Sequence, residues 1–205
     1  MPLGSSAPPR IGGHTALAAD LWPRRTDGFS AWLRIAVLIA FGSVLLALSA
    51  KVNLPLPLVP MTLQTLVVVL IGAAYGARLG AATVLAYLAE GAAGLPVFAG
   101  PVGGLAPLLG PTAGYLAGFV VAAVLVGWCA ERGFDRSVAK LFAAMLAGHL
   151  TILTLGFAWL AFGLDLGLTK AWWVGVVPFL AGSLVKSALG AALLPAVRRI
   201  VDRQR

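Results

Sequence analysis

Charged residues, cysteines and histidines are all scarce in this 205-residue chain, and their scarcity excludes several classes of protein. Only 11% of the residues are charged, and Cys129, the single cysteine, can form no intrachain disulfide. His14 and His149 lie far apart, without the spacing of a metalloprotease, so we expect no metal site. No glycine directly precedes a lysine, as a phosphate-binding loop requires, and no G-x-S-x-G elbow occurs. We therefore expect no enzymatic activity, no ATP hydrolysis and no cofactor.

Apolar sequence is abundant instead, with 60% hydrophobic residues and a mean hydropathy of +0.96. A helix needs roughly 20 apolar residues to cross a hydrocarbon core about 30 Å thick. The length therefore predicts an all-α membrane bundle of about six transmembrane helices over residues 31–205, after a flexible cytoplasmic tail at 1–30. The net charge of +8 does not indicate nucleic acid, because the basic residues mark the ends of apolar runs. The expected helices cover residues 32–50, 61–76, 79–94, 111–130, 139–163 and 171–197.

The basic residues also predict which helix ends face the cytoplasm, since lysine and arginine collect in cytoplasmic connections. If the N-terminus is cytoplasmic, the 15 lysine and arginine residues all fall on the cytoplasmic side except Lys51, Lys170 and Lys186. Both termini are therefore predicted to be cytoplasmic. Arg24 and Arg25 before an apolar run also fit a cleavable export signal, which would invert this topology. Such a signal usually begins closer to the start of a chain.

Two connections on the opposite side, Val52–Pro60 and Gly94–Pro111, are long, rich in proline and glycine, and still largely apolar. Non-helical backbone near membrane depth is tolerated where protein buries it or where it lines a cavity. We expect both connections to fold inward, as lid and lining of a pocket that opens outward.

Two ionisable side chains inside apolar segments are the strongest candidates for ligand contacts, because such groups are costly in a bilayer unless they face the protein interior. Lys186 lies near the middle of the last segment, on one helix face with Ser183, and its ammonium could hold a carboxylate or carbonyl. A lysine that snorkels to the interface or forms a structural pair is the alternative. Glu90, on one face with Tyr87, could accept hydrogen bonds from ligand N–H groups or pair structurally with Lys186.

For the remaining candidate residues, a structural role is weighed against contact with a ligand or a partner. His149 lies among apolar neighbours in the fifth segment and is interpreted as a hydrogen-bonded packing residue. Phe98 and Tyr115 adjoin the second apolar connection, where they either clamp an apolar ring or belong to an interfacial aromatic belt. Ala36 and Ala40 belong to a stripe of small residues on the first helix, which permits close helix packing within the protein or with a partner.

Three stretches of this sequence resemble the BioY family, the substrate-binding S components of energy-coupling-factor (ECF) vitamin transporters. They are Pro55–Thr65 (PLPLVPMTLQT), Gly91–Gly100 (GAAGLPVFAG) and Leu109–Tyr115 (LGPTAGY), in the family's order and spacing. The resemblance covers about residues 31–197. It adds Thr62 and Gln64, in the first stretch, to the expected binding residues.

The resemblance implies a biotin-binding subunit of the bacterial inner membrane that works with a transmembrane coupling subunit and a pair of ATPases. Members close the site with the loop between the first two helices and dock the coupling subunit on an Ala-x-x-x-Ala stripe, which Ala36 and Ala40 match. The last helix of the family often has an acidic residue three positions before a ligand-contacting lysine. Lys186 matches that lysine, but Ser183 stands at the acidic position, and we hypothesise that Glu90 supplies the lost acceptor or that affinity is lower.

Two further classes of function compete with biotin capture. One is an ion-gradient-driven carrier or intramembrane enzyme, with Glu90 and His149 as proton-handling groups. The other is a scaffold without a ligand, for which no vitamin would raise thermal stability.

Overall fold

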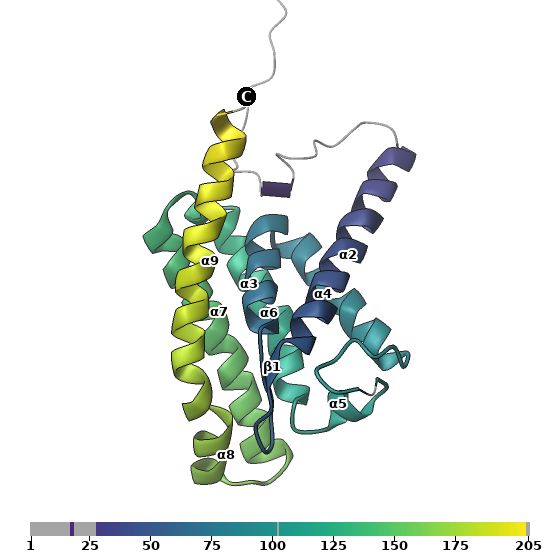
Figure 1. Ribbon diagram of the computed structural model, residues 1–205, viewed down its shortest axis with the longest axis vertical. Coiled ribbons are helices and arrows are strands. Elements are labelled where there is room, and N and C mark those ends of the chain that lie inside the picture. Colours follow the sequence, from purple (N-terminus) through teal and green to yellow (C-terminus); the bar gives the residue numbers. More distant parts are fainter. Residues whose placement is uncertain (1–16, 19–27, 102, 204–205) are drawn as a thin grey trace, which may run out of the picture.

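The computed structural model describes residues 17–18, 28–101 and 103–203, and it is a helical bundle with one short hairpin (Figure 1). Most of the predicted tail at 1–30 lies outside the described residues. The long elements are α2 (Gly28–Lys51), α3 (Gln64–Tyr75), α4 (Ala77–Ala92), α6 (Ala113–Ala130), α7 (Val138–Ala158) and α9 (Val177–Arg203). The short ones are β1 (Asn53–Leu54), β2 (Met61–Thr62), α5 (Ala106–Leu109), the 3-10 turn η1 (Phe134–Arg136), the π-helical turn η2 (Trp159–Gly163) and α8 (Leu168–Gly175).

Helix α6 is the central element and packs against α3, α4 and α7. Small residues on its surface allow this, because a Cβ atom added at Gly118 would lie 2.9 Å from the Cα atom of Ile152 on α7. Helices α3 and α4 are joined through Gly76 alone, whose φ of 83° is a conformation that residues with a side chain rarely adopt. This tight turn makes α3 and α4 an antiparallel pair.

The start of α2 and the end of α9 lie at the same end of the bundle, at the top of Figure 1. The hairpin β1–β2, α5 and α8 lie toward the other end. In the hairpin, Asn53 pairs with Thr62 and Leu54 with Met61, so the two strands close the first apolar connection at its base. Both predicted loops are therefore at the end of the bundle opposite the start of α2 and the end of α9.

Among the described residues, four helices are long and apolar enough to cross a membrane: Phe29–Lys51, Ala113–Ala130, Val138–Gly163 and Val177–Arg199. Helix α3 has 12 residues and rises only about 18 Å, well short of a hydrocarbon core. The prediction that helix covers 61–76 was wrong at its start, because Met61 and Thr62 pair with β1. The single helix predicted at 171–197 is also two helices, α8 and α9, separated at Val176.

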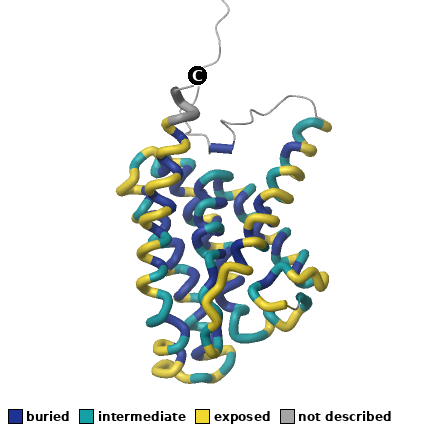
Figure 2. Tube along the Cα trace, in the orientation of Figure 1, coloured by how far each residue is buried: buried dark blue, intermediate teal, exposed yellow. Residues whose placement is uncertain are grey.

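The outer surface of the bundle is apolar. Large hydrophobic side chains of α2 point outward, among them Trp32 at 73% exposure, Phe41 at 58% and Leu48 at 62%. Figure 2 shows the same division, with exposed positions along the outer faces of α2 and α9 and buried ones toward the interior. Water-soluble monomers rarely expose apolar patches of this extent, so lipid is the natural surrounding of this surface.

Candidate ligand-binding site

A cavity of about 390 Å³ lies among β2, α3, α6, α7, α9 and the two apolar connections. This is within the range of small-molecule sites. The lining is mainly apolar and aromatic, with a few polar groups. Its members are Val59, Pro60, Thr62, Gln64, Thr65, Phe98, Ala99, Gly100, Pro101, Ala106, Pro107, Thr112, Tyr115, Leu116, Phe119, His149, Ile152, Leu153, Phe179, Ser183 and Lys186.

The ammonium of Lys186 enters this cavity from α9 and is held by β2 and the start of α3. Its Nζ atom donates to the carbonyl oxygen of Thr62 at 2.6 Å and to the Thr65 hydroxyl at 3.1 Å. An ammonium has three N–H donors, so these two bonds leave one for a ligand. Among the described residues that line the cavity, none is acidic. A bound anion or carbonyl would therefore find one fixed positive charge and no carboxylate competing for it.

A chain of hydrogen bonds fixes the backbone that holds Lys186. Gln64 donates from Nε2 to the Tyr87 hydroxyl at 2.6 Å, and Tyr87 donates to the carbonyl oxygen of Val97 at 3.0 Å. The Thr62 hydroxyl donates to Gln64 Oε1 at 3.3 Å. Tyr87 does not itself line the cavity and ties α3 and α4 to the second connection, whereas Thr62 and Gln64 do line it.

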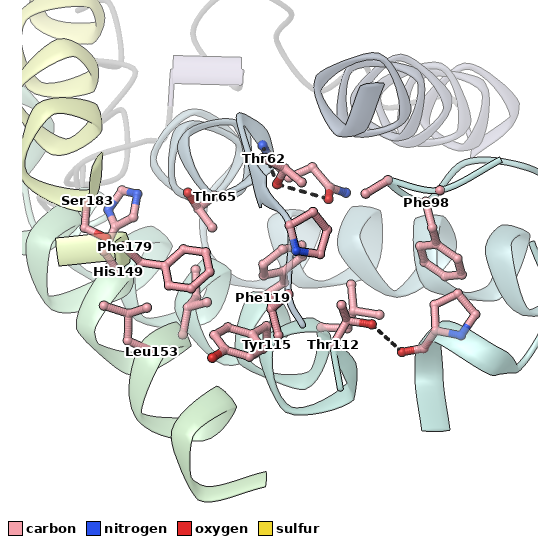
Figure 3. Close-up of a pocket in the computed structure, with 18 of the residues that line it drawn as sticks. Thr62, Thr65, Phe98, Thr112, Tyr115, Phe119, His149, Leu153, Phe179 and Ser183 are labelled. Atoms are coloured by element: carbon pink, nitrogen blue, oxygen red, sulfur yellow. Dashed lines mark hydrogen bonds between the residues drawn. The ribbon is translucent and has the colours of Figure 1, made fainter. Parts of the chain in front are cut away.

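Aromatic side chains form much of the remaining wall. Tyr115 and Phe179 face each other with ring centroids 5.9 Å apart, and the Tyr115 hydroxyl donates to the carbonyl oxygen of Gly175 at 2.6 Å. Phe98 is 3% exposed and meets the Tyr87 ring edge-on at 5.5 Å. In Figure 3, Phe98 lies at the end of the cavity away from Phe179. For Phe98 and Tyr115 the packing supports the pocket interpretation over the aromatic belt.

The prediction that both apolar connections contribute to the lining of a cavity is confirmed for part of each, while much of the first connection is exposed. Val59 and Pro60 of the first connection line the cavity, as do residues of the second between Phe98 and Pro107. Lys51, at the end of α2, donates to the carbonyl oxygens of Phe98 at 2.8 Å and Gly100 at 3.0 Å. The end of α2 is thus bonded directly to the wall of the cavity.

Two of the predicted polar residues have different surroundings. Ser183 is buried and lines the cavity beside Lys186 on α9. Glu90 is not among the described residues that line the cavity, and its carboxylate accepts a hydrogen bond from the Ser43 hydroxyl on α2. The structure therefore does not bring Glu90 to Lys186 or to Ser183. The hypothesis that Glu90 replaces the missing acidic residue at position 183 has no support in this geometry.

The sequence interpretation treated His149 as a hydrogen-bonded packing residue, which its Nδ1 contact with the Met145 carbonyl oxygen fits, and did not place it at the cavity. It is 1% exposed, lines the cavity, and has a buried Nε2 atom without a hydrogen-bond partner among the described residues. Ile152 and Leu153, three and four positions later on α7, line the same cavity. This helical spacing was the available signal, because it puts the histidine on the cavity face of α7.

These features define a class: a helical membrane protein with a small, largely apolar cavity that has one ammonium group in its wall. The model of the BioY family matches residues 23–203, so the chain belongs to the BioY family.

Proteins named as biotin transporters are similar to this chain over most of its length. The biotin transporter BioY2 of Lactococcus lactis subsp. cremoris is 35% identical, covering 78% of this chain and 90% of that protein. The biotin transporter BioY of Rhizobium etli is 38% identical, over 80% and 91% of the two chains. A crystal structure of the S component for biotin from an ECF-type ABC transporter has the same fold, with a TM-score of 0.74. Its sequence is 24% identical, and the match covers 85% of this chain and 95% of that one.

Proposed function

We propose that this chain captures biotin within the membrane as the substrate-binding subunit of an ECF-type transporter. The observation that carries the proposal is the enclosed apolar cavity with the Lys186 ammonium in its wall. Biotin combines a fused apolar ring system with a ureido group and a carboxylate, so it offers surface to an apolar lining and oxygen atoms to an ammonium. Membership of the family and the names of the similar proteins support the choice of biotin.

The direct test is equilibrium binding of radiolabelled biotin to the purified protein in detergent. We expect saturable binding that unlabelled biotin and desthiobiotin displace, whereas thiamine and riboflavin do not. A tight ligand must also raise the thermal stability of the protein that it binds. Absence of saturable biotin binding by folded protein would overturn the proposal, and stabilisation by another vitamin would redirect it.

We further propose that the chain crosses the bacterial inner membrane six times with both termini in the cytoplasm. The basic residues support this orientation, because Arg78 lies in the first turn of α4, and Arg132 and Arg136 lie between α6 and α7, on the side predicted to be cytoplasmic. Helices α3 and α4 are short for a full crossing, and residues of the connections that follow β1 and α4 line the cavity beside them, as non-helical backbone near membrane depth can.

A transmembrane coupling subunit and a pair of ATPases complete the proposed transporter, since this chain has no phosphate-binding loop of its own. We propose α2 as the docking helix. Ala36 and Ala40 are both exposed on its outer face, four residues apart, which supports close approach of a partner helix. Energy from ATP would then drive release of biotin into the cytoplasm.

A further inference from the structure

The imidazole of His149 has one satisfied nitrogen and one unsatisfied nitrogen, and the unsatisfied one belongs to a residue of the cavity wall. Its Nδ1 atom lies 2.9 Å from the carbonyl oxygen of Met145 and 3.0 Å from the hydroxyl oxygen of Ser187. Its Nε2 atom is buried and has no partner among the described residues. Buried polar atoms are nearly always hydrogen-bonded, so an orphan nitrogen on a residue that lines a cavity points to a ligand that reaches it.

The contacts of Nδ1 decide what Nε2 can do. A carbonyl oxygen only accepts hydrogen bonds, so Nδ1 carries the proton that it donates to Met145 and shares with the Ser187 oxygen. The neutral imidazole is favoured, because the cavity wall offers no carboxylate among its described residues and an unpaired buried charge is costly. Nε2 then has a free lone pair and is a hydrogen-bond acceptor.

The wall of the same cavity also holds a donor. Ser187, which contacts His149, directly follows Lys186 on α9, and both His149 and Lys186 line the cavity. Figure 3 shows His149 with Ser183 and Phe179 at the same end of the cavity. A strong donor beside a neutral acceptor is complementary to one edge of a cyclic urea, where an N–H group adjoins the carbonyl.

We propose that His149 Nε2 accepts a hydrogen bond from a ureido N–H of biotin while Lys186 donates to the ureido carbonyl oxygen. The inference rests on the proposed function and deepens it, because it orients the ligand with its ureido ring at α7 and α9. It also gives this chain a ring-nitrogen acceptor where the family often has a carboxylate, at the position of Ser183. The site would therefore select ligands by an N–H donor rather than by ring shape alone.

Two isosteric substitutions of His149 separate its two nitrogens. The amide of His149→Gln reaches the position of Nε2 and retains an acceptor in the cavity. The amide of His149→Asn reaches the position of Nδ1 and retains the donor to Met145, but leaves the cavity without the acceptor. Biotin and two derivatives, each methylated on one ureido nitrogen, are titrated against both variants and the wild type. Thermal unfolding without ligand reports whether each variant is folded.

We expect wild type to bind one of the methylated biotins at least about tenfold more weakly than biotin, the order expected for one lost hydrogen bond. The His149→Gln variant should bind biotin within about threefold of wild type and keep the wild-type ratio of affinities for biotin and the methylated biotin. The His149→Asn variant should bind biotin about tenfold more weakly, and its two affinities should be nearly equal. An unchanged ratio in the Asn variant, with biotin bound as tightly as by wild type, would overturn the role of His149 and leave biotin capture intact. Failure of folded wild type to bind biotin would instead overturn the proposed function.

Discussion

Lys186 shows how one side chain is prepared for a ligand by the residues around it. Two oxygens, from the Thr62 backbone and the Thr65 side chain, hold its ammonium at 2.6 and 3.1 Å. The hydrogen-bond chain through Gln64 and Tyr87 fixes that backbone in turn. The charge is therefore oriented before a ligand arrives, which lowers the entropy lost on binding.

Replacing Lys186 by methionine should remove the charge while keeping much of the apolar stem. A hydrogen bond from a charged donor is worth about 1.5–3 kcal/mol, so biotin affinity should fall roughly ten- to a hundredfold. Isothermal titration of the purified variant measures this. Lys170→Met is the matched control, because Lys170 is exposed on α8 and outside the cavity. Equal affinities of both variants and wild type would remove Lys186 from the site.

From the sequence, Lys186 was predicted to face a ligand pocket, whereas His149 was not placed there, and both residues line the cavity. A lysine in an apolar helix is so costly that its position alone indicates a function. A histidine among Met145, Ile152 and Leu153 is compatible with packing, and the orphan nitrogen becomes visible only when its neighbours are placed. For Glu90 the sequence left open a ligand contact or a structural pairing. In the structure its carboxylate accepts a hydrogen bond from Ser43, a partner 47 positions away in the chain, which sequence alone does not indicate.

Among the elements, the long apolar helices were predictable and their interruptions were not. Residues 111–130 were predicted as a helix, and α6 covers Ala113–Ala130, because an apolar run of that length has few other stable forms in a bilayer. The break at Val176 and the hairpin at Met61–Thr62 fall within apolar sequence. Hydropathy alone indicates neither irregularity, although Pro178 in the first turn of α9 fits a helix that begins there.

The inner face of α2 packs against the bundle, whereas its outer face is the proposed docking surface. Substitutions on the outer face therefore test docking separately from ligand binding. Ala36→Trp with Ala40→Trp adds bulk only on the exposed face, so purified protein should bind biotin like wild type. In cells that also produce a coupling subunit and its ATPases, biotin uptake should fall at least about tenfold, because close helix packing needs small residues. Ala188→Trp with Ala192→Trp, an exposed pair of the same spacing on α9, is the control and should transport normally. Full uptake by the α2 variant would contradict docking at this stripe.

For the whole molecule, the two ends of the bundle differ in what they bury. The end with the two apolar connections holds the cavity, and the end where α2 starts and α9 ends holds an ion pair between Asp135 of η1 and Arg198 of α9. Both side chains are almost fully buried, at 0% and 2% exposure. The pair ties the α6–α7 connection to the last helix, so it closes the bundle at the end away from the ligand.

Arg198→Met should destabilise the fold without changing the cavity. It leaves the Asp135 carboxylate buried without its guanidinium, and breaking such a pair costs about 3 kcal/mol or more. Thermal unfolding in detergent should therefore occur at a clearly lower temperature, while biotin affinity of the folded fraction stays within about twofold of wild type. Arg199→Met, at the exposed neighbouring position, should unfold like wild type. Equal stability of the two variants would show that the pair contributes nothing.

The orientation of the molecule can be tested with single cysteines, because Cys129 is buried and can be replaced by alanine to give a cysteine-free background. Lys170→Cys and Arg136→Cys then add one exposed thiol at each end of the bundle. If both termini are cytoplasmic, a membrane-impermeant maleimide added to intact cells should label the Lys170→Cys protein and leave the Arg136→Cys protein unlabelled until the membrane is opened. The reverse labelling pattern would show the opposite topology. The cavity would then open toward the cytoplasm, which would contradict capture of external biotin.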